Sequence, residues 1–214
     1  MQMKKTTWIS ALVMFCLAVT SVIAQTAPAA PSTPLTADER AFALQQLQTT
    51  RDNFLKSIAG LSQKQWTFKP APDRWSVAEV AEHITVSEST IFGLVQKTMQ
   101  SPAAPENREQ VKGKDQLILQ KIVDRSHKAQ APEILRPTGR WGTEAELTKT
   151  FEASRKVTMD YVKTTNDDLR DHFFDHPVFG TLDGYQWLLL LSGHSARHTE
   201  QIEEVKAAPN FPKE

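Results

Sequence analysis

Apolar side chains recur at steps of three and four residues in four stretches of the chain, at residues 36–60, 76–100, 143–165 and 183–205. This spacing places them on one face of an α-helix, so each stretch predicts an amphipathic helix with one buried stripe. The stripes comprise Leu44, Leu47, Phe54, Leu55 and Ile58 in the first helix, Val80, His83, Ile84, Ser87, Ile91 and Leu94 in the second, Leu147, Phe151, Ser154, Thr158 and Tyr161 in the third, and Trp187, Leu191, His194, His198, Ile202 and Val205 in the fourth.

Polar residues mark the starts of these helices. In the capping-box pattern, a Ser or Thr hydroxyl accepts a hydrogen bond from a backbone N–H of the first turn, and a glutamate three residues later reaches back to the capping residue. The pattern occurs at Thr36, Ser76 and Thr143, and Asp183 is expected to cap the fourth helix. These four positions define where the helices begin.

The segments between the helices are expected to be irregular. Residues 61–75 and 101–142 form connections that contain proline, with an accessory helix predicted over 115–127, and residues 172–180 form a crossover before the fourth helix. Only 8 glycines occur in 214 residues, which argues against an architecture of strands and turns. The sequence therefore predicts an all-α fold, a four-helix bundle with long crossover connections.

Three histidines on the inward stripes are the candidate site. His194 and His198 are four residues apart, so their rings project from the same face of a helix. That spacing allows two imidazoles to bind one metal ion, and His83 on the second helix can supply a third ligand. Three neutral imidazoles with an open position suit a divalent ion such as zinc or nickel. The alternative is a set of core histidines that are hydrogen-bonded to neighbouring polar groups.

The first 24 residues have the three parts of a secretory signal peptide. Lys4 and Lys5 form the positive start, an apolar run follows, and Val22-Ile23-Ala24 gives the small-residue ending. The apolar run is short for a bilayer span of about 20 residues, although an uncleaved membrane anchor is an alternative. We therefore expect a periplasmic or secreted protein with no stable membrane insertion after signal cleavage.

The composition of the chain indicates its domain boundaries and excludes some classes of partner and site. Residues 25–35 are rich in Ala, Pro, Thr and Ser and predict a disordered linker, followed by one domain at 36–208 and a tail at 209–214. The 25 basic and 25 acidic residues balance and form no block, so nucleic acid is not an expected partner. The one cysteine, Cys16, lies in the signal peptide, which excludes a cysteine-based zinc site from the mature chain.

Two motifs resemble the signatures of a known family, the DinB-like (DinB/YfiT) proteins. The motif RWSVAEVAEH at residues 74–83 is similar to the second-helix signature of that family, and HSARHTEQI at residues 194–202 is similar to its fourth-helix pattern. The turns at residues 136–141 and 179–180 resemble family turns as well. The resemblance extends over most of the chain.

The resemblance implies a metal-binding four-helix bundle of DinB-like type, with His83, His194 and His198 as the metal ligands. Some members of the family are thiol-dependent transferases or isomerases that use a metal to hold a low-molecular-weight thiol as thiolate. A metal-dependent hydrolase or transferase that acts on a small molecule is the activity expected for this chain.

Other polar residues near the histidines are candidates for further roles. Glu79 and Glu82 are weak candidates for a catalytic carboxylate, with helix capping as the alternative for Glu79. Gln201 is expected to hold the second nitrogen of a neighbouring imidazole, or else to have a surface or packing role. His172 and His176 in the crossover could supply an extra ligand or a pocket wall.

Three functional classes remain open at this stage. They are an exported metal-dependent enzyme, a non-catalytic module that binds a metal or a small ligand, and a bundle whose metal only stabilises the fold. The fourth-helix motif is not the HExxH of metalloproteases, because Ser195 occupies the position of the catalytic glutamate. A homodimer through a helix face is compatible with such a bundle, although no residue specifies it.

Overall fold

The computed structural model describes residues 34–126 and 130–213. The predicted signal peptide, the predicted linker up to residue 33 and His127 lie outside the described residues. Within the described part of the chain, no helix has the length and apolar character needed to cross a membrane. Four long helices dominate the structure: α1 (Ala37–Ile58), α3 (Val77–Thr98), α6 (Glu144–Thr164) and α7 (Gly184–Lys206).

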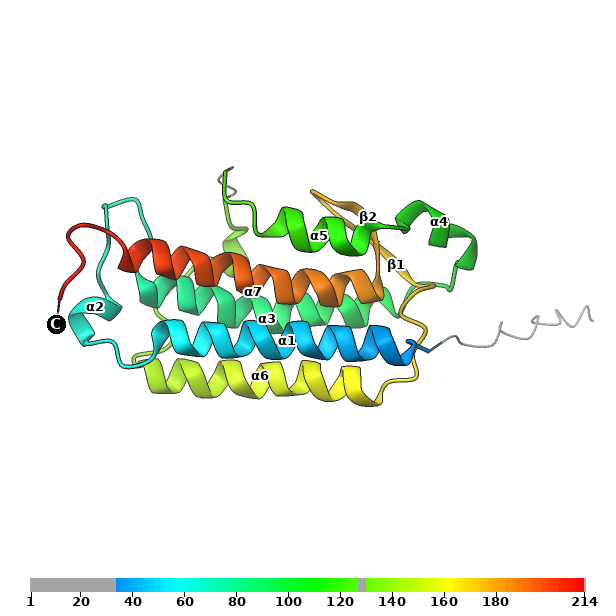
Figure 1. The fold of residues 1–214 in the computed structure, drawn as a ribbon, viewed down its shortest axis with the longest axis horizontal. Coiled ribbons are helices and arrows are strands. Elements are labelled where there is room, and N and C mark those ends of the chain that lie inside the picture. The colour runs from blue at the N-terminus through cyan, green and yellow to red at the C-terminus, as the bar shows by residue number, and fades with distance from the viewer. Residues whose placement is uncertain (1–33, 127–129, 214) are drawn as a thin grey trace, which may run out of the picture. The chain divides into compact units, whose positions relative to one another are not determined.

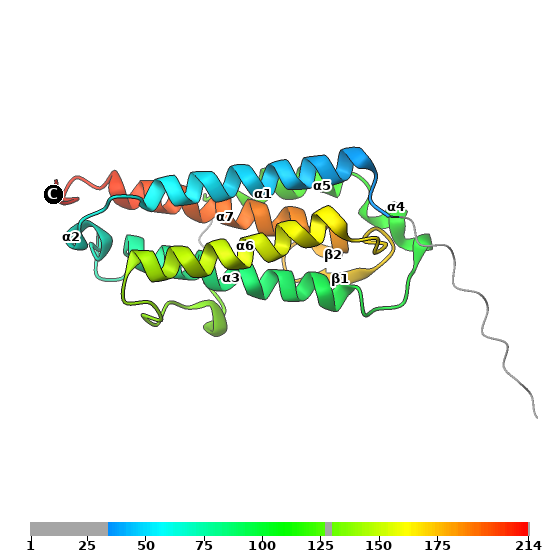
Figure 2. The ribbon, with the colours of Figure 1, turned by 90° about the horizontal axis from the view of Figure 1, so that it is seen from below.

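The long helices lie side by side as a bundle (Figures 1 and 2). Both α7 and α6 pack against α1 and α3, so α1 and α3 occupy one diagonal of the bundle and α6 and α7 the other. The second and third long helices, α3 and α6, run parallel (Figure 1), so the chain between them must return along the bundle. The predicted four-helix bundle with a long crossover connection is therefore confirmed.

The connections contain short elements, of which the sequence predicted only one. They are α2 (Gln63–Trp66) between α1 and α3, and η1 (Pro105–Asn107), α4 (Arg108–Val111), α5 (Lys114–Ile122) and η2 (Glu133–Leu135) between α3 and α6. The predicted accessory helix is α5, which ends at Ile122, before the expected boundary at residue 127. It packs along the outside of α7.

The crossover before α7 differs from the prediction, because it forms a β-hairpin. Strands β1 (Phe173–His176) and β2 (Gly180–Asp183) pair antiparallel, with His176 opposite Gly180 at the turn. Gly180 has a φ of +67°, a conformation that glycine adopts without a steric penalty. The hairpin places His176 beside the first turn of α7, where its ring packs against Trp187.

The helix caps follow the sequence expectation with one exception. Thr36 and Ser76 form complete capping boxes, and Asp183 caps α7 in the same way. At Thr143 only the hydroxyl bond forms, because the side chain of Glu146 accepts instead from the backbone N–H of the residue before the cap. The third capping box is therefore only half present.

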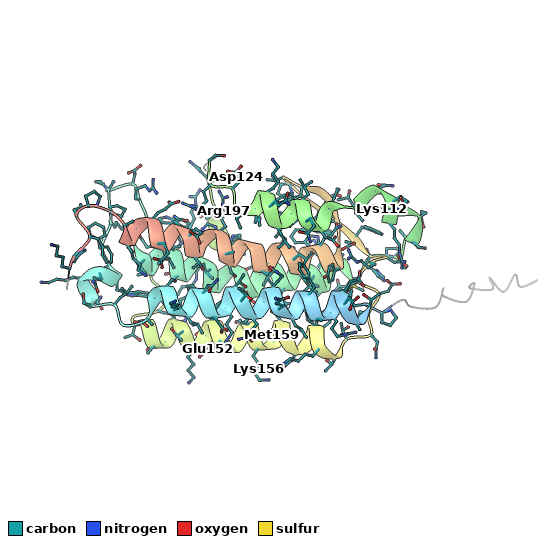
Figure 3. All side chains as sticks on the ribbon, viewed as in Figure 1. Lys112, Asp124, Glu152, Lys156, Met159 and Arg197 are labelled. Carbon is teal, nitrogen blue, oxygen red and sulfur yellow. The ribbon has the colours of Figure 1, made fainter. Side chains whose placement is uncertain are left out.

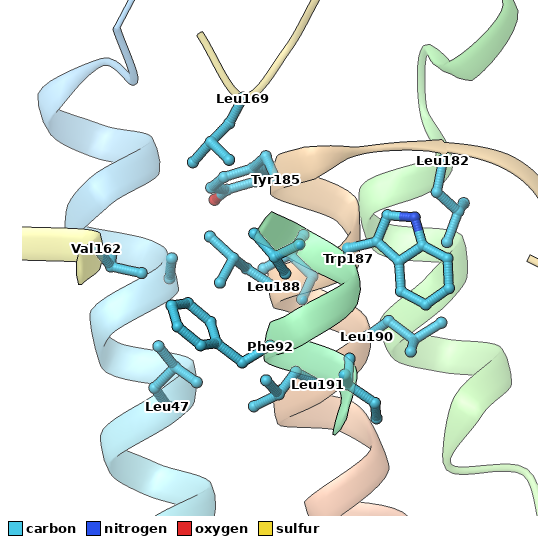
Figure 4. Packing of buried hydrophobic residues seen from close by; sticks show 14 of the residues in the cluster. Leu47, Phe92, Val162, Leu169, Leu182, Tyr185, Trp187, Leu188, Leu190 and Leu191 are labelled. Carbon is cyan, nitrogen blue, oxygen red and sulfur yellow. The ribbon is translucent and has the colours of Figure 1, made fainter. Parts of the chain in front are cut away.

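Apolar side chains inside the bundle form two clusters. The larger cluster joins the N-terminal half of α7 to the neighbouring helices and to β2, as Figure 4 shows. Leu35, at the end of the predicted linker, is buried in it. The second cluster lies around the start of α3 and the end of α7. There Phe68 packs edge-on against Phe211 of the predicted tail, with ring centroids 5.4 Å apart, so both segments help to close that end.

A buried ion pair, absent from the sequence expectations, joins the four long helices. Arg155 on α6 binds both carboxylate oxygens of Glu88 on α3, at 2.9 and 2.7 Å, and both side chains are 0% exposed. The same guanidinium donates to Ser195 Oγ on α7 at 2.8 Å, and to the carbonyl of Leu47 and Thr50 Oγ1 on α1 at 2.6 and 2.9 Å. One arginine thus contacts all three neighbouring helices.

The close packing of α5 on α7 depends on Gly193. A Cβ atom at this position would lie 2.4 Å from Cγ2 of Ile122. We predict that Gly193→Ala lowers the free energy of unfolding by about 1–3 kcal/mol, because the end of α5 must move. Gly93→Ala in α3 is the matched control, since nothing lies within 4 Å of its added Cβ, and it should raise stability by about 0.5–1 kcal/mol. Urea unfolding measures both, and equal effects would contradict this packing.

Candidate metal centre

Three histidine rings meet where α3 packs against α7. The Nε2 atoms of His83 and His198 are 3.2 Å apart, and one ring nitrogen of each of these residues and of His194 lies within 4.8 Å of the others. The ring centroids are separated by 4.4 to 5.0 Å. His83 is 3% exposed, whereas His194 and His198 are half-buried residues. The cluster therefore lies between the core and the outer face of α7.

The local sequence explains this convergence. Four residues separate His194 from His198, so both side chains project from the same face of α7, one turn apart. His83 lies on the stripe of α3 that packs toward α7. Trp75, just before the cap of α3, packs on the His83 ring with centroids 5.1 Å apart and restricts its movement.

Hydrogen bonds at the Nδ1 atoms of His83 and His198 fix the tautomers of these two rings. His83 Nδ1 lies 2.8 Å from the carbonyl oxygen of Leu135, which can only accept, so this nitrogen carries the proton. His198 Nδ1 lies 2.8 Å from Gln201 Oε1. Arg125 Nη1 donates to the same amide oxygen at 3.4 Å, which supports this orientation of the amide. In both neutral rings the Nε2 atom therefore carries a lone pair.

The spacing of the imidazole nitrogens suits a bound cation. Two Nε2 lone pairs 3.2 Å apart repel each other and cannot form a hydrogen bond, because neither nitrogen carries a proton. In a tetrahedral site with metal–nitrogen bonds of about 2.0–2.1 Å, the ligand nitrogens are about 3.4 Å apart. The separation between His83 and His198 is close to this value, and His194 adds a third nitrogen within 4.8 Å. The arrangement could hold a divalent metal ion.

Burial keeps the rings neutral. It lowers the pKa of His83, although the hydrogen bond to Leu135 acts in the opposite direction. Burial lowers the pKa of His198 to about 3, and the charge of His83 acts in the same direction. Burial, followed by the charges of His198 and His83, holds the pKa of His194 well below its usual range. At neutral pH the cluster is thus three neutral imidazoles, the form that binds metals.

The two glutamates considered as catalytic candidates have structural partners. Glu79 completes the capping box of α3 and forms an ion pair with Lys69 at 2.7 Å. Glu82 accepts hydrogen bonds from three consecutive backbone N–H groups at residues 138–140, at 2.7 to 3.2 Å, and from the Arg140 guanidinium at 2.7 Å. Burial raises the pKa of Glu82, but these bonds outweigh it and lower the pKa. Glu82 thus anchors the loop before α6.

Two arginines attach the segment after α5 to α7. Arg125 binds both carboxylate oxygens of Glu204, at 2.6 and 2.8 Å. Arg197 donates to the carbonyl oxygen of Ile122 at 2.9 Å and to that of Asp124. Figure 3 shows Arg197 of α7 below Asp124. These contacts hold Arg125 where it can bond the amide of Gln201.

The remaining candidate histidines are placed elsewhere. Within residues 34–126 and 130–213, neither His172 nor His176 belongs to the three-ring cluster. His172 Nδ1 lies 2.6 Å from the carbonyl oxygen of Ser101. His176 packs between Trp187 and Phe179, with ring centroids 5.3 and 5.1 Å away.

The sequence pattern indicated Gln201, which lies against His198 as expected, but it missed the other partners that orient the rings. A backbone carbonyl such as that of Leu135 leaves no signal in the sequence, and Arg125 lies in a segment without clear periodicity. The sequence did contain a signal for the role of Glu82. The Pro137-Thr138-Gly139 turn before α6 is of a kind that presents successive backbone N–H groups to an anion.

Comparisons with known proteins agree with this arrangement. The sequence pattern of the DinB superfamily matches residues 46–202. The uncharacterized protein YuaE of Bacillus subtilis (strain 168) is 24% identical over 149 residues, which cover 70% of this chain and 88% of the relative.

Two solved structures have the same fold. YfiT from Bacillus subtilis, described as a probable metal-dependent hydrolase with an unusual four-helix bundle topology, gives a TM-score of 0.55 at 12% identity and covers 86% of this chain and 94% of its own. TT2238, a four-helix bundle protein, gives a TM-score of 0.50 at 16% identity and covers 77% of this chain and 98% of its own.

Proposed function

The chain belongs to the DinB superfamily, and from that premise we propose that it is a metal-dependent hydrolase or transferase that acts on a small molecule. In this proposal His83, His194 and His198 bind one divalent ion, zinc or nickel. The observation that carries it is the 3.2 Å separation of two imidazole nitrogens that both hold lone pairs. The likeness to YfiT, a probable metal-dependent hydrolase, supports the same interpretation.

The surrounding residues prepare the three rings for this role. When bound, a divalent ion supplies Lewis-acid chemistry, in which it polarises a substrate oxygen or lowers the pKa of water towards about 7. The Leu135 carbonyl and the Gln201 amide oxygen hold their rings with Nε2 free to bind the ion. His194 and His198 are half-buried residues of α7, and a small molecule would approach from that side.

One observation favours a second candidate, a non-catalytic module that binds a metal or a small ligand. Metal-assisted hydrolysis usually requires a general base near the reacting water. Glu79 and Glu82 are poor candidates for that base, because both carboxylates already hold the start of α3 or the loop before α6. A thiol transferase would need such a base less, because a bound divalent ion would lower the pKa of a thiol ligand and the released proton would pass to water.

We also propose that the protein acts outside the cytoplasm, in the periplasm or the medium. This proposal rests on the sequence of residues 1–24, with its two lysines, apolar run and small-residue ending. Mass determination of the protein recovered from the extracytoplasmic fraction tests it, with cleavage after Ala24 as the expected result. Full-length protein in the cytoplasm would contradict it.

Removal and return of the metal test the enzymatic proposal. We expect protein lacking residues 1–24 to turn over at least one class in a panel of aryl esters, anilides, phosphoesters and thiol-acceptor pairs. A chelator should abolish turnover. Added zinc or nickel should raise the rate at least about tenfold above that of the chelated protein, because the ion acts as a Lewis acid. His172→Ala, outside the cluster, is the matched control and should behave as the wild type. Metal-loaded protein without turnover in any class would favour the non-catalytic module.

A further inference from the structure

The loop before α6, residues 131–140, is attached to the bundle by two consecutive residues of α3. Glu82 accepts hydrogen bonds from the backbone N–H groups of residues 138–140. The next residue, His83, bonds the carbonyl oxygen of Leu135 through Nδ1. Among the described residues, the other hydrogen bonds of this loop join loop residues to one another or to Glu82. The loop therefore depends on Glu82 and His83 for its polar attachment.

The carboxylate of Glu82 is the stronger of these two attachments. Glu82 is 4% exposed, and its oxygens lie 2.7 to 3.2 Å from the three backbone nitrogens. Gly139 has a φ of +78°, the left-handed conformation that turns successive N–H groups toward one anion. Hydrogen bonds to an ionised acceptor are roughly twice as strong as those between neutral groups. Glu82 thus holds the loop more firmly than the single bond to the neutral His83 ring does.

The chain between the two attachments is short and stiff. Two residues separate Leu135 from the first N–H group that Glu82 binds, and one of them is Pro137, whose ring fixes its φ angle. The guanidinium of Arg140 adds a second connection, because it donates to Glu82 at 2.7 Å and to the carbonyl oxygen of Arg136 at 3.1 Å. Release of the loop from Glu82 would therefore also release the carbonyl of Leu135.

The Leu135 carbonyl determines which nitrogen of His83 presents a lone pair to the other histidines. While Nδ1 donates to this carbonyl, the lone pair is on Nε2, 3.2 Å from Nε2 of His198. Without the carbonyl, the proton of the neutral ring can move to Nε2 and donate to His198 instead, and that tautomer cannot bind a metal through Nε2. Trp75 packs on the face of the His83 ring and limits its rotation, but it does not select the tautomer.

We propose that Glu82 is a positioning residue for the metal centre: by anchoring the loop, it holds the Leu135 carbonyl against His83 and keeps the Nε2 atom of that ring free to bind the ion. Loop anchoring and metal binding are then coupled, and the factor by which the anchored loop raises metal affinity equals the factor by which the metal favours the anchored loop. This inference rests on the proposed metal site and deepens it.

The substitution Glu82→Gln tests the positioning role through zinc affinity. The amide keeps the size of the side chain, but its NH2 group cannot accept from the loop N–H groups, and the charge is lost. We expect the dissociation constant for zinc to rise about tenfold, the lower end of the effect of losing a partner that orients a metal ligand. Competition with a chromogenic chelator measures it, at a temperature where circular dichroism shows both proteins folded. An unchanged dissociation constant would overturn the proposal, because Trp75 and the surrounding packing would then suffice to hold His83.

Two further variants separate the loop from the fold. Glu146→Gln is the matched control, because this carboxylate accepts from the N–H group of Gly142 at 3.2 Å but is not bonded to the segment that carries Leu135. Zinc affinity should be unchanged in this control, and a loss equal to that of Glu82→Gln would overturn the proposal. Arg140→Met leaves Glu82 its three backbone donors, so affinity should fall only about two- to threefold, the weaker end of the effect of one hydrogen bond. If Glu82→Gln does not fold, Arg140→Met decides, and wild-type affinity in that variant would overturn the proposal.

The ring proton of His83 gives a readout that a role confined to the loop would not change. Nitrogen-15 NMR of the metal-free wild type should place this proton on Nδ1, and in Glu82→Gln it should exchange with water at least about tenfold faster, because local opening becomes easier. In the wild type, added zinc should slow hydrogen exchange at the amides of residues 138–140 by about tenfold, the same coupling measured from the other side. A His83 proton unaffected by Glu82→Gln, or amide exchange unaffected by zinc, would overturn the proposal.

Zinc binding by the wild type separates this inference from the proposed function. If the wild type binds no zinc after reconstitution, the proposed function fails and the positioning role fails with it. If the wild type and Glu82→Gln bind one equivalent of zinc with equal affinity, the metal site stands and the positioning role alone is wrong.

Discussion

The double substitution His194→Ala/His198→Ala is expected to abolish metal binding. Wild-type protein purified without a His-tag and without added metal should carry about one equivalent of zinc or nickel, and the double variant less than about a tenth of that. The reason is that two of three ligands are removed and His83 alone cannot hold the ion. Elemental analysis by mass spectrometry gives the measurement.

Thermal stability supplies an independent readout of the same prediction. A metal that binds only the folded state stabilises it by about 2.7 kcal/mol when its free concentration is 100 times the dissociation constant. A chelator should therefore lower the melting temperature of the wild type and leave that of the double variant unchanged. His172→Ala removes a histidine that bonds the carbonyl of Ser101 and should keep the metal. Metal-free wild type after reconstitution, with a melting temperature unaffected by chelator, would contradict the assignment.

The second large effect is expected at the buried ion pair. Arg155→Ala should lower the free energy of unfolding by about 3–5 kcal/mol, because it leaves the Glu88 carboxylate buried without its partner. The same change leaves the carbonyl oxygen of Leu47 without its donor from Arg155. Urea denaturation of the metal-free protein measures the loss, so that metal binding does not contribute.

Two further variants show whether the charge is the cause. Replacing both partners, as in Arg155→Met/Glu88→Leu, removes the unpaired charge and should recover most of the stability lost in the single variant. Lys156→Met, at the next position of α6, breaks an ion pair with Asp160 on the surface and should change little. If Arg155→Ala and Lys156→Met had similar small effects, the buried pair would not be important for stability.

The sequence predicted the helices because their signals are local. Apolar residues that repeat every three to four positions indicate α1, α3, α6 and α7, and the capping residues lie next to the turns that they cap. The strands of the hairpin gave no such signal, because each has four residues and too little alternation to distinguish it from a loop. Arg155 was also missed, because an arginine on a helix is ordinarily exposed.

The sequence by itself determined the four amphipathic helices, their polar caps and the position of three histidines on inward stripes. Only the tertiary structure decided which of their nitrogens are free for a metal, because the tautomer of His83 depends on the Leu135 carbonyl, 52 residues away in the chain. It likewise decided that Arg155 is buried, since its partner Glu88 is 67 residues away. Periodicity reports which face of a helix is apolar, whereas the partner of a polar atom depends on how distant segments pack, and no local pattern encodes that choice.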